Sequence, residues 1–513
     1  MHRRILCWTF LLVCAPSARG STLHVPTSEF PSVQAAIDSS ASGDTLLLAS
    51  GVYEENPRVY VKDLTIRSAP GGLAILDATP RAGEDGNAGC AMRSVHSALV
   101  IEDLVLRNGL PVTEGAGLWV WGGHVEVRRC RFENNVYGVL VFEPIPGTIR
   151  LEECEFVGNG IGVWGFVSTT IERCRFANNW IGLRLRDRIE LRDVEVTGSG
   201  APWKWGAPPF NAASLLLVGA SGQLERVAVH HNSIPNGLPG IWLEVGPYEL
   251  VDCTSSHNDS QLGPSGITCV RVTDLTMRRC VASYNTSRGP APPIGGLFAD
   301  RSHVRAEQCR FEFNDSGANG SGICALRNAT VEMTGGRIVG NRTEIKGGGV
   351  YASAARVHLD SVLVAGNMAQ AGAAIALDRD GEVHVQRSTL VANVASGGAA
   401  ALYNVGGVAT LEQSIVAFNT GSPVLVCAGD VTRRCIDVFG NSDDGTCGRD
   451  LGDNLSVDPE FCGFDPKGGV YDVRLAEGSP LVAACGGIGA AGPGCTSTTA
   501  QAITWSAAKR LFR

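Results

Sequence analysis

The sequence predicts an all-β fold, a right-handed single-stranded parallel β-helix solenoid of about 13–15 coils. A segment of about 26 residues recurs along the chain, and apolar residues alternate inside each copy as they do in β-strands. A unit of this length cannot bury its apolar side alone, so it must stack on the next one. One repeated position holds Cys or another small or apolar residue, at Leu104, Cys130, Cys154, Cys174, Val194, Val227, Cys253, Cys280, Cys309, Gly336, Val362, Ser388 and Ser414. An Asn follows this position in most copies, at Asn135, Asn159, Asn179, Asn232, Asn258, Asn285, Asn314, Asn341, Asn367, Asn393 and Asn419.

Each repeat divides into three short strands and a turn. In one coil the first strand begins at 162–164, the second contains 170–171 and the third follows from 174–176. Asn178 and Asn179 then turn the chain back. Three parallel strands per turn define a right-handed parallel β-helix. Asn suits this turn because it tolerates left-handed backbone conformations and its amide can bond to the Asn above and below.

The 513-residue chain divides into four parts. Residues 1–20 have a basic start, an apolar core and small residues before Ser21, which is the pattern of a secretory signal peptide. Residues 21–420 form the β-helix, 421–495 a Cys-rich C-terminal cap and 496–513 a tail. We therefore expect a secreted, extracellular or cell-surface protein, with the periplasm as an alternative. No later segment is long and apolar enough to cross a bilayer.

A short amphipathic helix is expected ahead of the first full coil. The segment 31–39 places Val33, Ala36 and Ile37 at helical spacing. This helix would cover the N-terminal end of the solenoid, and strands are expected to begin at 44–56.

The cysteines fall into two groups. Two sets of three occupy the same repeat position in consecutive coils, at Cys130, Cys154 and Cys174 and at Cys253, Cys280 and Cys309. Such positions lie about 4.8 Å apart, which permits either disulfides or small apolar core thiols, and we expect mostly unpaired thiols. Six cysteines lie in the Gly- and Asp-rich C-terminal region, where disulfides are expected, with sequential pairing as our prediction among the 15 connectivities. These six are Cys427, Cys435, Cys447, Cys462, Cys485 and Cys495.

Several segments resemble known β-helix proteins. The segments SVQAAI (32–37), GDTLLL (43–48) and GVYEEN (51–56) resemble the opening of many pectin-lyase-like right-handed β-helix proteins, and the Asn-containing coils resemble the repeat of that superfamily. CIDVFGN (435–441) and NLSVDPEFC (454–462) resemble a segment of secreted bacterial β-helix proteins of unassigned function. The resemblance implies the fold, leaves the activity open, and implies that the C-terminal block covers the open end of the solenoid.

In that superfamily substrates usually lie along the first strand stack, and strand alternation gives its outward residues here. In the strand at 117–121, Leu118 and Val120 point inward while Trp119 and Trp121 point outward. The same alternation in the following coils predicts a stripe of outward aromatic side chains on one sheet, and an enlarged turn near 200–210 is expected to flank it. Sugar rings could pack on such aromatic side chains. The residues expected to bind a polysaccharide are Trp119, Trp121, Phe142, Trp164, Phe166, Trp203, Trp205 and Trp242. The alternative is ordinary aromatic pairing between strands, or a stripe covered by the loops themselves.

Catalytic motifs are mostly missing. Of the polygalacturonase motifs only Asp443-Asp444 occurs, and it lies in the cap. Pectin methylesterases share the opening Gly51-x-Tyr53-x-Glu55, but their later motifs are missing, so this likeness is structural. A lyase needs only a group that neutralises charge and one base, which no local pattern reveals. The candidate groups beside the stripe are Arg184, Arg186, Lys204, Glu244 and Asp300, and the alternative for each is a solvated surface residue.

No metal or cofactor site is predicted. His230-His231 has no further Cys or His at metal-ligand spacing and is interpreted as a turn pair. The segment 378–381 resembles the start of a calcium loop but lacks the downstream Glu, so a tight turn is expected and calcium has no support.

Three functional hypotheses remain. The leading one is an exported β-helix protein that binds a glycan or has a cell-surface role without an identifiable catalytic motif. The alternatives are a polysaccharide lyase or glycoside hydrolase acting in a groove on the first strand stack, and a structural or adhesive rod. The net charge is −8 and the chain has no basic run, so no nucleic acid is expected as a partner. We expect the protein to be a monomer.

Overall fold

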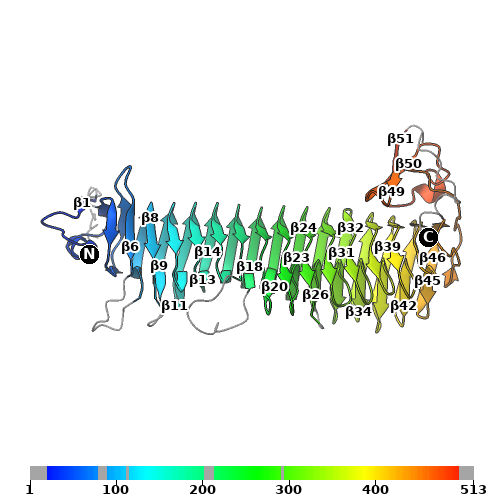
Figure 1. Ribbon diagram of the computed structural model, residues 1–513, viewed down its shortest axis with the longest axis horizontal. Helices are drawn as coiled ribbons and strands as arrows, with labels where there is room; N and C mark the ends of the chain where they lie inside the picture. Colours follow the sequence, from blue (N-terminus) through cyan, green and yellow to red (C-terminus); the bar gives the residue numbers. More distant parts are fainter. Residues whose placement is uncertain (1–19, 79–88, 111–114, 201–212, 290–293, 496–513) are drawn as a thin grey trace, which may run out of the picture.

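The computed structural model describes residues 20–78, 89–110, 115–200, 213–289 and 294–495. The chain forms a long rod of stacked coils that makes about 15 turns (Figure 1). Within the described residues one sheet contains 16 strands, all contributed by the third strand of a coil. The predicted all-β parallel solenoid is therefore confirmed. Residues 1–19 of the predicted signal peptide and the predicted tail at 496–513 lie outside the described residues.

The coils divide as the repeat predicts. In the coil expected at 162–179, β13 (Ile161–Gly165), β14 (Ser168–Glu172) and β15 (Arg175–Ala177) follow one another. In several neighbouring coils the first two strands merge into one bent strand, as in β9 (Ala116–Arg128), β11 (Tyr137–Glu152), β16 (Ile181–Arg192), β18 (Ala213–Glu225), β20 (Leu238–Val251) and β23 (Ile267–Arg278). For this reason the first and second strand stacks join into one sheet, which has 26 strands in the part of the chain that the structure describes.

The third strand stack forms the 16-stranded sheet. Its strands are β3 (Gly51–Tyr53), β6 (Ala74–Asp77), β8 (Leu104–Arg107), β10 (Arg131–Glu133), β12 (Glu155–Val157), β15, β17 (Glu195–Thr197), β19 (Ala228–His230), β21 (Thr254–Ser256), β24 (Val281–Ser283), β28 (Arg310–Glu312), β32 (Arg337–Val339), β36 (Leu363–Ala365), β40 (Thr389–Val391), β44 (Ile415–Ala417) and β47 (Asp437–Phe439). Parallel pairing keeps equivalent residues in register, so Phe132, Phe156 and Phe176 stack inside the core with ring centroids 4.7 and 4.5 Å apart.

The repeated Cys position lies inside the solenoid. The two sets of three cysteines are buried and unpaired, as predicted, and so are Cys269 and Cys324. Burial raises the pKa of Cys130 and Cys174 well above the ordinary thiol value. These thiols therefore stay protonated and pack as small apolar side chains.

A ladder of buried Asn side chains runs through the turn after the third strand. The amide Nδ2 of Asn135 donates to Oδ1 of Asn159 at 3.0 Å, and Asn159 donates in the same way to Asn179. The ladder resumes at Asn232 and continues to Asn441. The predicted hydrogen bonding between Asn side chains is confirmed. The ladder Asn residues themselves do not have the predicted left-handed backbone conformation.

The residue before the ladder position takes the left-handed conformation instead. Asn134 and Asn178 have φ of 55°, and His231 has φ of 54°. The reason is geometric: the ladder amide must point inward to meet the next amide, so the exposed residue ahead of it makes the turn.

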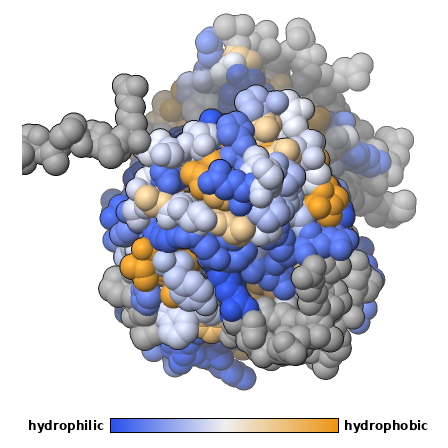
Figure 2. All heavy atoms as spheres, turned by 90° about the vertical axis from the view of Figure 1, so that its left-hand side faces the viewer, coloured by the Kyte–Doolittle hydropathy of each residue, from blue (hydrophilic) through white to orange (hydrophobic). Residues whose placement is uncertain are grey.

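The N-terminal end is closed by the expected helix. α1 (Val33–Ser39) begins after Ser32, whose Oγ accepts a hydrogen bond from the Ala35 N–H at 3.1 Å. Val33, Ala36 and Ile37 are buried in the main core. β1 (Thr22–Val25) precedes the helix and pairs with β2 (Thr45–Leu48), although no strand was expected there. Seen end-on, this end of the rod is mostly hydrophilic with scattered hydrophobic residues (Figure 2).

The C-terminal region packs on the side of the rod. The stacks extend beyond residue 420 through β45 (Leu425–Cys427), β46 (Asp430–Arg434) and β47. A small sheet of β49 (Phe461–Asp465), β50 (Val470–Ala476) and β51 (Pro493–Cys495) then lies beside the last coils (Figure 1). At the open end of the solenoid, where this block is expected, β48 (Arg449–Asp450) pairs with β46 and Leu455 pairs with Asp437, so residues 449–455 cover part of the last coil. The small sheet lies instead on the third strand stack, whose outward side chains become apolar there, at Val339, Ala365, Val391, Ile415 and Ala417.

The six C-terminal cysteines form three disulfides, as predicted, but not in sequential order. The pairs are Cys427–Cys447, Cys435–Cys485 and Cys462–Cys495, with Cα atoms 5.9, 6.3 and 5.9 Å apart. The sequential pairing is therefore wrong. Each cysteine pairs with the cysteine that the fold brings next to it, which is not the next cysteine in the sequence.

Candidate binding face on the first strand stack

The outward face of the first strand stack carries the predicted aromatic residues, and we call it the stripe face. The predicted alternation of inward and outward side chains is confirmed, because Leu118 and Val120 belong to the main core while Trp119 lies in a separate cluster outside it. Exposure differs between the two tryptophans: Trp119 is only 6% exposed and Trp121 is 40% exposed. Part of the predicted stripe is thus covered and part is open to solvent.

Trp119 is the centre of the first aromatic cluster. Its ring centroid lies 5.7 Å from those of Trp121 and Phe142. The guanidinium of Arg93, one coil earlier, lies 4.9 Å from the same ring. Such cation–π contact holds an arginine against an aromatic surface.

Trp164 and Phe166 continue the stripe two coils further on. Trp164 lies 5.5 Å from both Tyr137 and Phe166, measured between ring centroids. Arg184 lies 5.2 Å from the Trp164 ring, and Arg186 lies 5.2 Å from the Phe166 ring. Burial and the neighbouring charge of Arg186 lower the pKa of Arg184. Arg186 itself is exposed, and within the described residues no carboxylate forms an ion pair with it.

The predicted acidic residues follow in the same column. Register places Arg186 beside Val218 and then Glu244, and Asp300 two coils after Glu244. Glu244 forms an ion pair with Arg271. Asp300 is 3% exposed and accepts two hydrogen bonds from Arg327, at 2.7 and 2.6 Å. Because stacked strands are about 4.8 Å apart, Arg186, Glu244 and Asp300 lie at steps of about 10 Å and do not converge.

The remaining predicted residues are placed as follows. Trp242 is half-buried on β20, in the same column as Trp164 and Arg184. Trp203, Lys204 and Trp205 lie outside the described residues.

A second charged cluster on the stripe face was missed by sequence reasoning. The Tyr351 hydroxyl donates to Oδ2 of Asp378 at 3.1 Å, and Lys346 Nζ lies 3.0 Å from the same oxygen. Lys346 also lies 5.2 Å from the Tyr403 ring. Burial and the charge of Asp378 raise the pKa of Tyr351 to about 12. The alternation of strand residues predicts that Tyr351 and Asp378 point outward. No sequence pattern near Lys346 predicts its contact with Asp378.

The segment 378–381 forms the expected tight turn, in which the Gly381 N–H donates to the Asp378 carbonyl at 3.0 Å. Among the residues that the structure describes, no group of three or more His, Cys, Asp or Glu side chains is placed to hold a metal ion. In the same residues, no helix is long and apolar enough to span a membrane.

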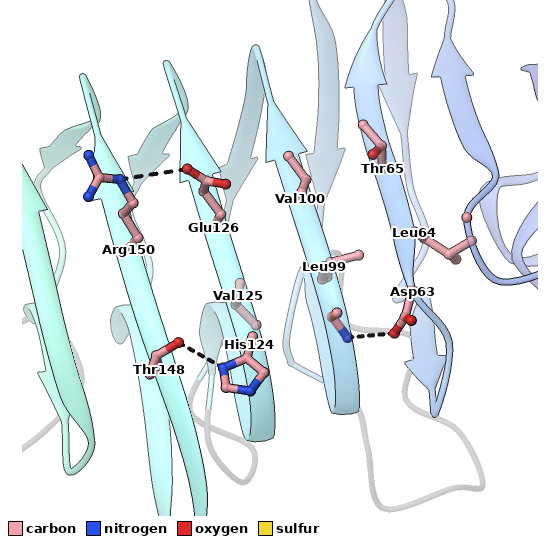
Figure 3. Close-up of a pocket in the computed structure, with 12 residues that line it drawn as sticks. Asp63, Leu64, Thr65, Leu99, Val100, His124, Val125, Glu126, Thr148 and Arg150 are labelled. Atoms are coloured by element: carbon pink, nitrogen blue, oxygen red, sulfur yellow. Dashed lines mark hydrogen bonds and ion pairs between the residues drawn. The ribbon is translucent and has the colours of Figure 1, made fainter. Parts of the chain in front are cut away.

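A shallow recess of about 470 Å³ lies on the second strand stack near the N-terminal end (Figure 3). His124 Nδ1 is 2.9 Å from Thr148 Oγ1, and Arg150 Nε is 3.6 Å from Glu126 Oε1. Both polar pairs lie to one side of Val100, whose neighbour in register on the next strand is Glu126. The recess contains none of the predicted site residues.

Comparison with known proteins supports the class of fold. Residues 159–367 match the family model described as right handed beta helix region. The coils on both sides continue the same parallel sheets, so the protein is a right-handed parallel β-helix.

Other comparisons give no activity. The crystal structure of pectate lyase Pel9A is similar at 12% sequence identity, over 88% of this chain and 85% of that chain, with a TM-score of 0.21. No curated protein matches the chain.

Proposed function

We propose that this protein is an exported β-helix protein that binds a glycan on the stripe face. The observation that carries the proposal is a run of aromatic rings and arginines on adjacent coils of one sheet face, from Trp119 to Arg186. Sugar rings pack their C–H faces on aromatic side chains, and arginine donates hydrogen bonds to hydroxyl or carboxylate oxygens.

The open part of the stripe face is the part suited to binding. Trp121 is 40% exposed, Phe142 and Phe166 are half-buried, and the Arg186 guanidinium is held at 5.2 Å from Phe166. A ring and a cation that are already held in place lose little conformational freedom when a ligand binds. Trp119 supports this surface from below and is not itself expected to contact the ligand.

A glycan array followed by affinity measurement tests the proposal. We expect the mature protein to bind at least one polysaccharide, and the Trp121→Ala/Arg186→Ala double variant to bind it at least about tenfold more weakly. Tyr284→Ala is a matched control because Tyr284 is 50% exposed and lies away from the stripe face. Equal affinity of the double variant and the wild type would remove the stripe face as the site. Absence of binding to any glycan would favour the purely structural rod.

Export is supported by the three disulfides, because such bonds persist in oxidising compartments outside the cytosol. Sequencing of the mature N-terminus tests this part. Export through the predicted signal peptide requires a chain that begins at Ser21, and an intact N-terminus on an intracellular protein would contradict it.

A polysaccharide lyase or glycoside hydrolase is the second candidate. The observation that favours it is the presence of Glu244 and Asp300 in one column with Arg186 on the stripe face. Both carboxylates are paired with arginines, so a substrate would have to displace those partners before either carboxylate could act as a base. Incubation with the glycan identified on the array distinguishes the candidates: new ultraviolet absorbance of unsaturated uronides or new reducing ends would indicate catalysis.

A further inference from the structure

Three histidines gather on the ridge that follows the third strand stack, away from the stripe face. β19 ends at His230, His231 follows it, and His257 holds the equivalent place one coil later. The rings of His231 and His257 are parallel, with centroids 4.8 Å apart. The Nδ1 atoms of His230 and His231 are 3.0 Å apart. The sequence interpretation of a simple turn pair does not account for this arrangement.

Glu195, on the preceding coil, orients the first of these histidines. Its Oε1 lies 3.0 Å from Nε2 of His230, and its Oε2 accepts a hydrogen bond from Nε of Arg175 at 2.8 Å. A carboxylate oxygen accepts hydrogen bonds, so in this contact His230 donates its Nε2–H to Glu195 and keeps a lone pair on Nδ1. A carboxylate hydrogen-bonded to the far nitrogen of an imidazole is the arrangement that orients histidine ligands in metal sites.

A metal ion can take the place of the proton between the two Nδ1 atoms when the N–H of the exposed His231 ring moves from Nδ1 to Nε2 through solvent. In the metal-free state, the His231 N–H meets the His230 lone pair across 3.0 Å. A metal bound to both nitrogens at 2.0–2.1 Å requires them to be about 3–4 Å apart. His231 is exposed and His230 keeps 26% of its side chain exposed, so the rings have room to make this adjustment.

We propose that His230 and His231 bind one divalent transition-metal ion, with Glu195 as the group that orients His230 and water completing the coordination. Imidazole nitrogens suit Cu²⁺, Ni²⁺ and Zn²⁺, and the general affinity order for such sites places Cu²⁺ first.

The site lies where the Asn ladder is interrupted. Ser199 occupies the ladder position between Asn179 and Asn232, and its buried hydroxyl has no hydrogen-bond partner within the described residues. Glu195 and His230 belong to the two coils on either side of this missing amide link. Asn232 still accepts a hydrogen bond from the Ser199 N–H at 2.7 Å and donates to the Val196 carbonyl at 3.2 Å, so only the link between two side chains is missing at this rung. An ion that binds the folded protein at His230 and His231 should raise the melting temperature.

Calorimetric titration of the untagged mature protein, stripped of metal with a chelator, tests the proposal. We expect one Cu²⁺ per chain, weaker Ni²⁺ and Zn²⁺ binding, and a higher melting temperature with each ion. His230→Gln/His231→Gln should weaken Cu²⁺ binding at least about tenfold. His358→Gln/His384→Gln is the matched control, because these two rings also lie together, with centroids 4.7 Å apart, on the second strand stack. The control should bind as the wild type does.

Glu195→Gln provides a test that leaves both ligands in place. Loss of an orienting carboxylate typically weakens metal binding by about 10–100-fold, so Glu195→Gln should fall between the wild type and the double histidine variant. Circular dichroism and melting in chelator show whether each variant folds. Absence of stoichiometric binding by the wild type would overturn the proposal. Binding that survives in the double histidine variant, as binding to the core thiols would, also overturns it.

Discussion

Asp437 is a buried carboxyl at the start of β47, in the last coil. Its Oδ1 accepts a hydrogen bond from the Val457 N–H at 2.9 Å, while Oδ2 has no hydrogen-bond partner within the described residues. Burial raises the pKa of Asp437 to about 6; the Val457 N–H opposes this shift, and the charges of Asp458 and Asp444 add to it. The C-terminal coil therefore contains a group whose ionisation disfavours the folded state.

The sign of the resulting pH dependence follows from the two pKa values. The folded pKa lies above the unfolded value of 3.8, so the stabilisation by Asp437 is complete below about pH 4 and is lost as the pH rises through about 6. A difference of about two units corresponds to about 3 kcal/mol. Asp437→Asn, which is neutral throughout, should therefore be more stable than the wild type at about pH 7.5 and similar to it at about pH 4. Thermal melts of both proteins at several pH values measure this, and a stability difference that does not change with pH would contradict it.

The Asn ladder is the element that ties successive turns together. Asn341 lies in its middle: Nδ2 donates to the Phe311 carbonyl at 2.8 Å and to Asn367 Oδ1 at 3.0 Å, and Oδ1 accepts from Asn314 Nδ2 at 2.9 Å. The side chain is fully buried. Removing it leaves several buried polar groups without partners, and each such group costs about 1–3 kcal/mol.

Asn341→Ala should accordingly lower the free energy of unfolding by on the order of 3 kcal/mol. Urea denaturation followed by circular dichroism measures the effect. Gln386→Ala, an outward-facing amide on β39 (Glu382–Gln386), is the matched control and should change stability by less than about 0.5 kcal/mol. Similar losses in the two variants would show that the ladder contributes little.

The sequence predicts elements whose residues recur at a fixed period. The Asn ladder, the core thiols and the outward phase of Trp121 all follow from the repeat, because in-register stacking turns a period in sequence into a column in space. The left-handed turn residue was misplaced by one position, since the sequence does not show which of Asn178 and Asn179 points inward. No covered face was predicted on the third strand stack; its apolar outward residues, such as Val391 and Ile415, were a signal that could have indicated one, but not the segment that covers it.

Contacts between distant segments could not be predicted in this way. The burial of Trp119 depends on Arg93 and Phe142, each of which belongs to another coil. Lys346 meets Asp378 across a separation of 32 residues. Disulfide partners depend on the path of the chain after the last coil, which the repeat no longer describes.

At the scale of the whole molecule, the rod presents faces with different chemistry. The stripe face carries exposed and half-buried aromatic rings with arginines. The third strand stack is covered by the small C-terminal sheet over its last coils. The ridge beyond it carries a stack of rings in which Tyr284 lies between His257 and Phe313, with centroids 4.9 and 5.1 Å away, so both faces of the Tyr284 ring are covered. Sugar packing needs a free ring face, and Trp121 is a 40% exposed ring that meets Trp119 at an interplanar angle of 82° and not face to face, which favours the stripe face as the proposed glycan-binding surface.

Hydroxyl-radical footprinting of the mature protein, with and without the glycan selected on the array, tests this claim most directly. Trp121, Tyr284 and Phe313 are 40%, 50% and 43% exposed, so all three should be oxidised in the free protein. Bound glycan should protect Trp121 and the neighbouring Phe166 and leave Tyr284 and Phe313 as reactive as before. Protection of Tyr284 or Phe313 with no change at Trp121 would contradict the assignment of the stripe face as the binding surface.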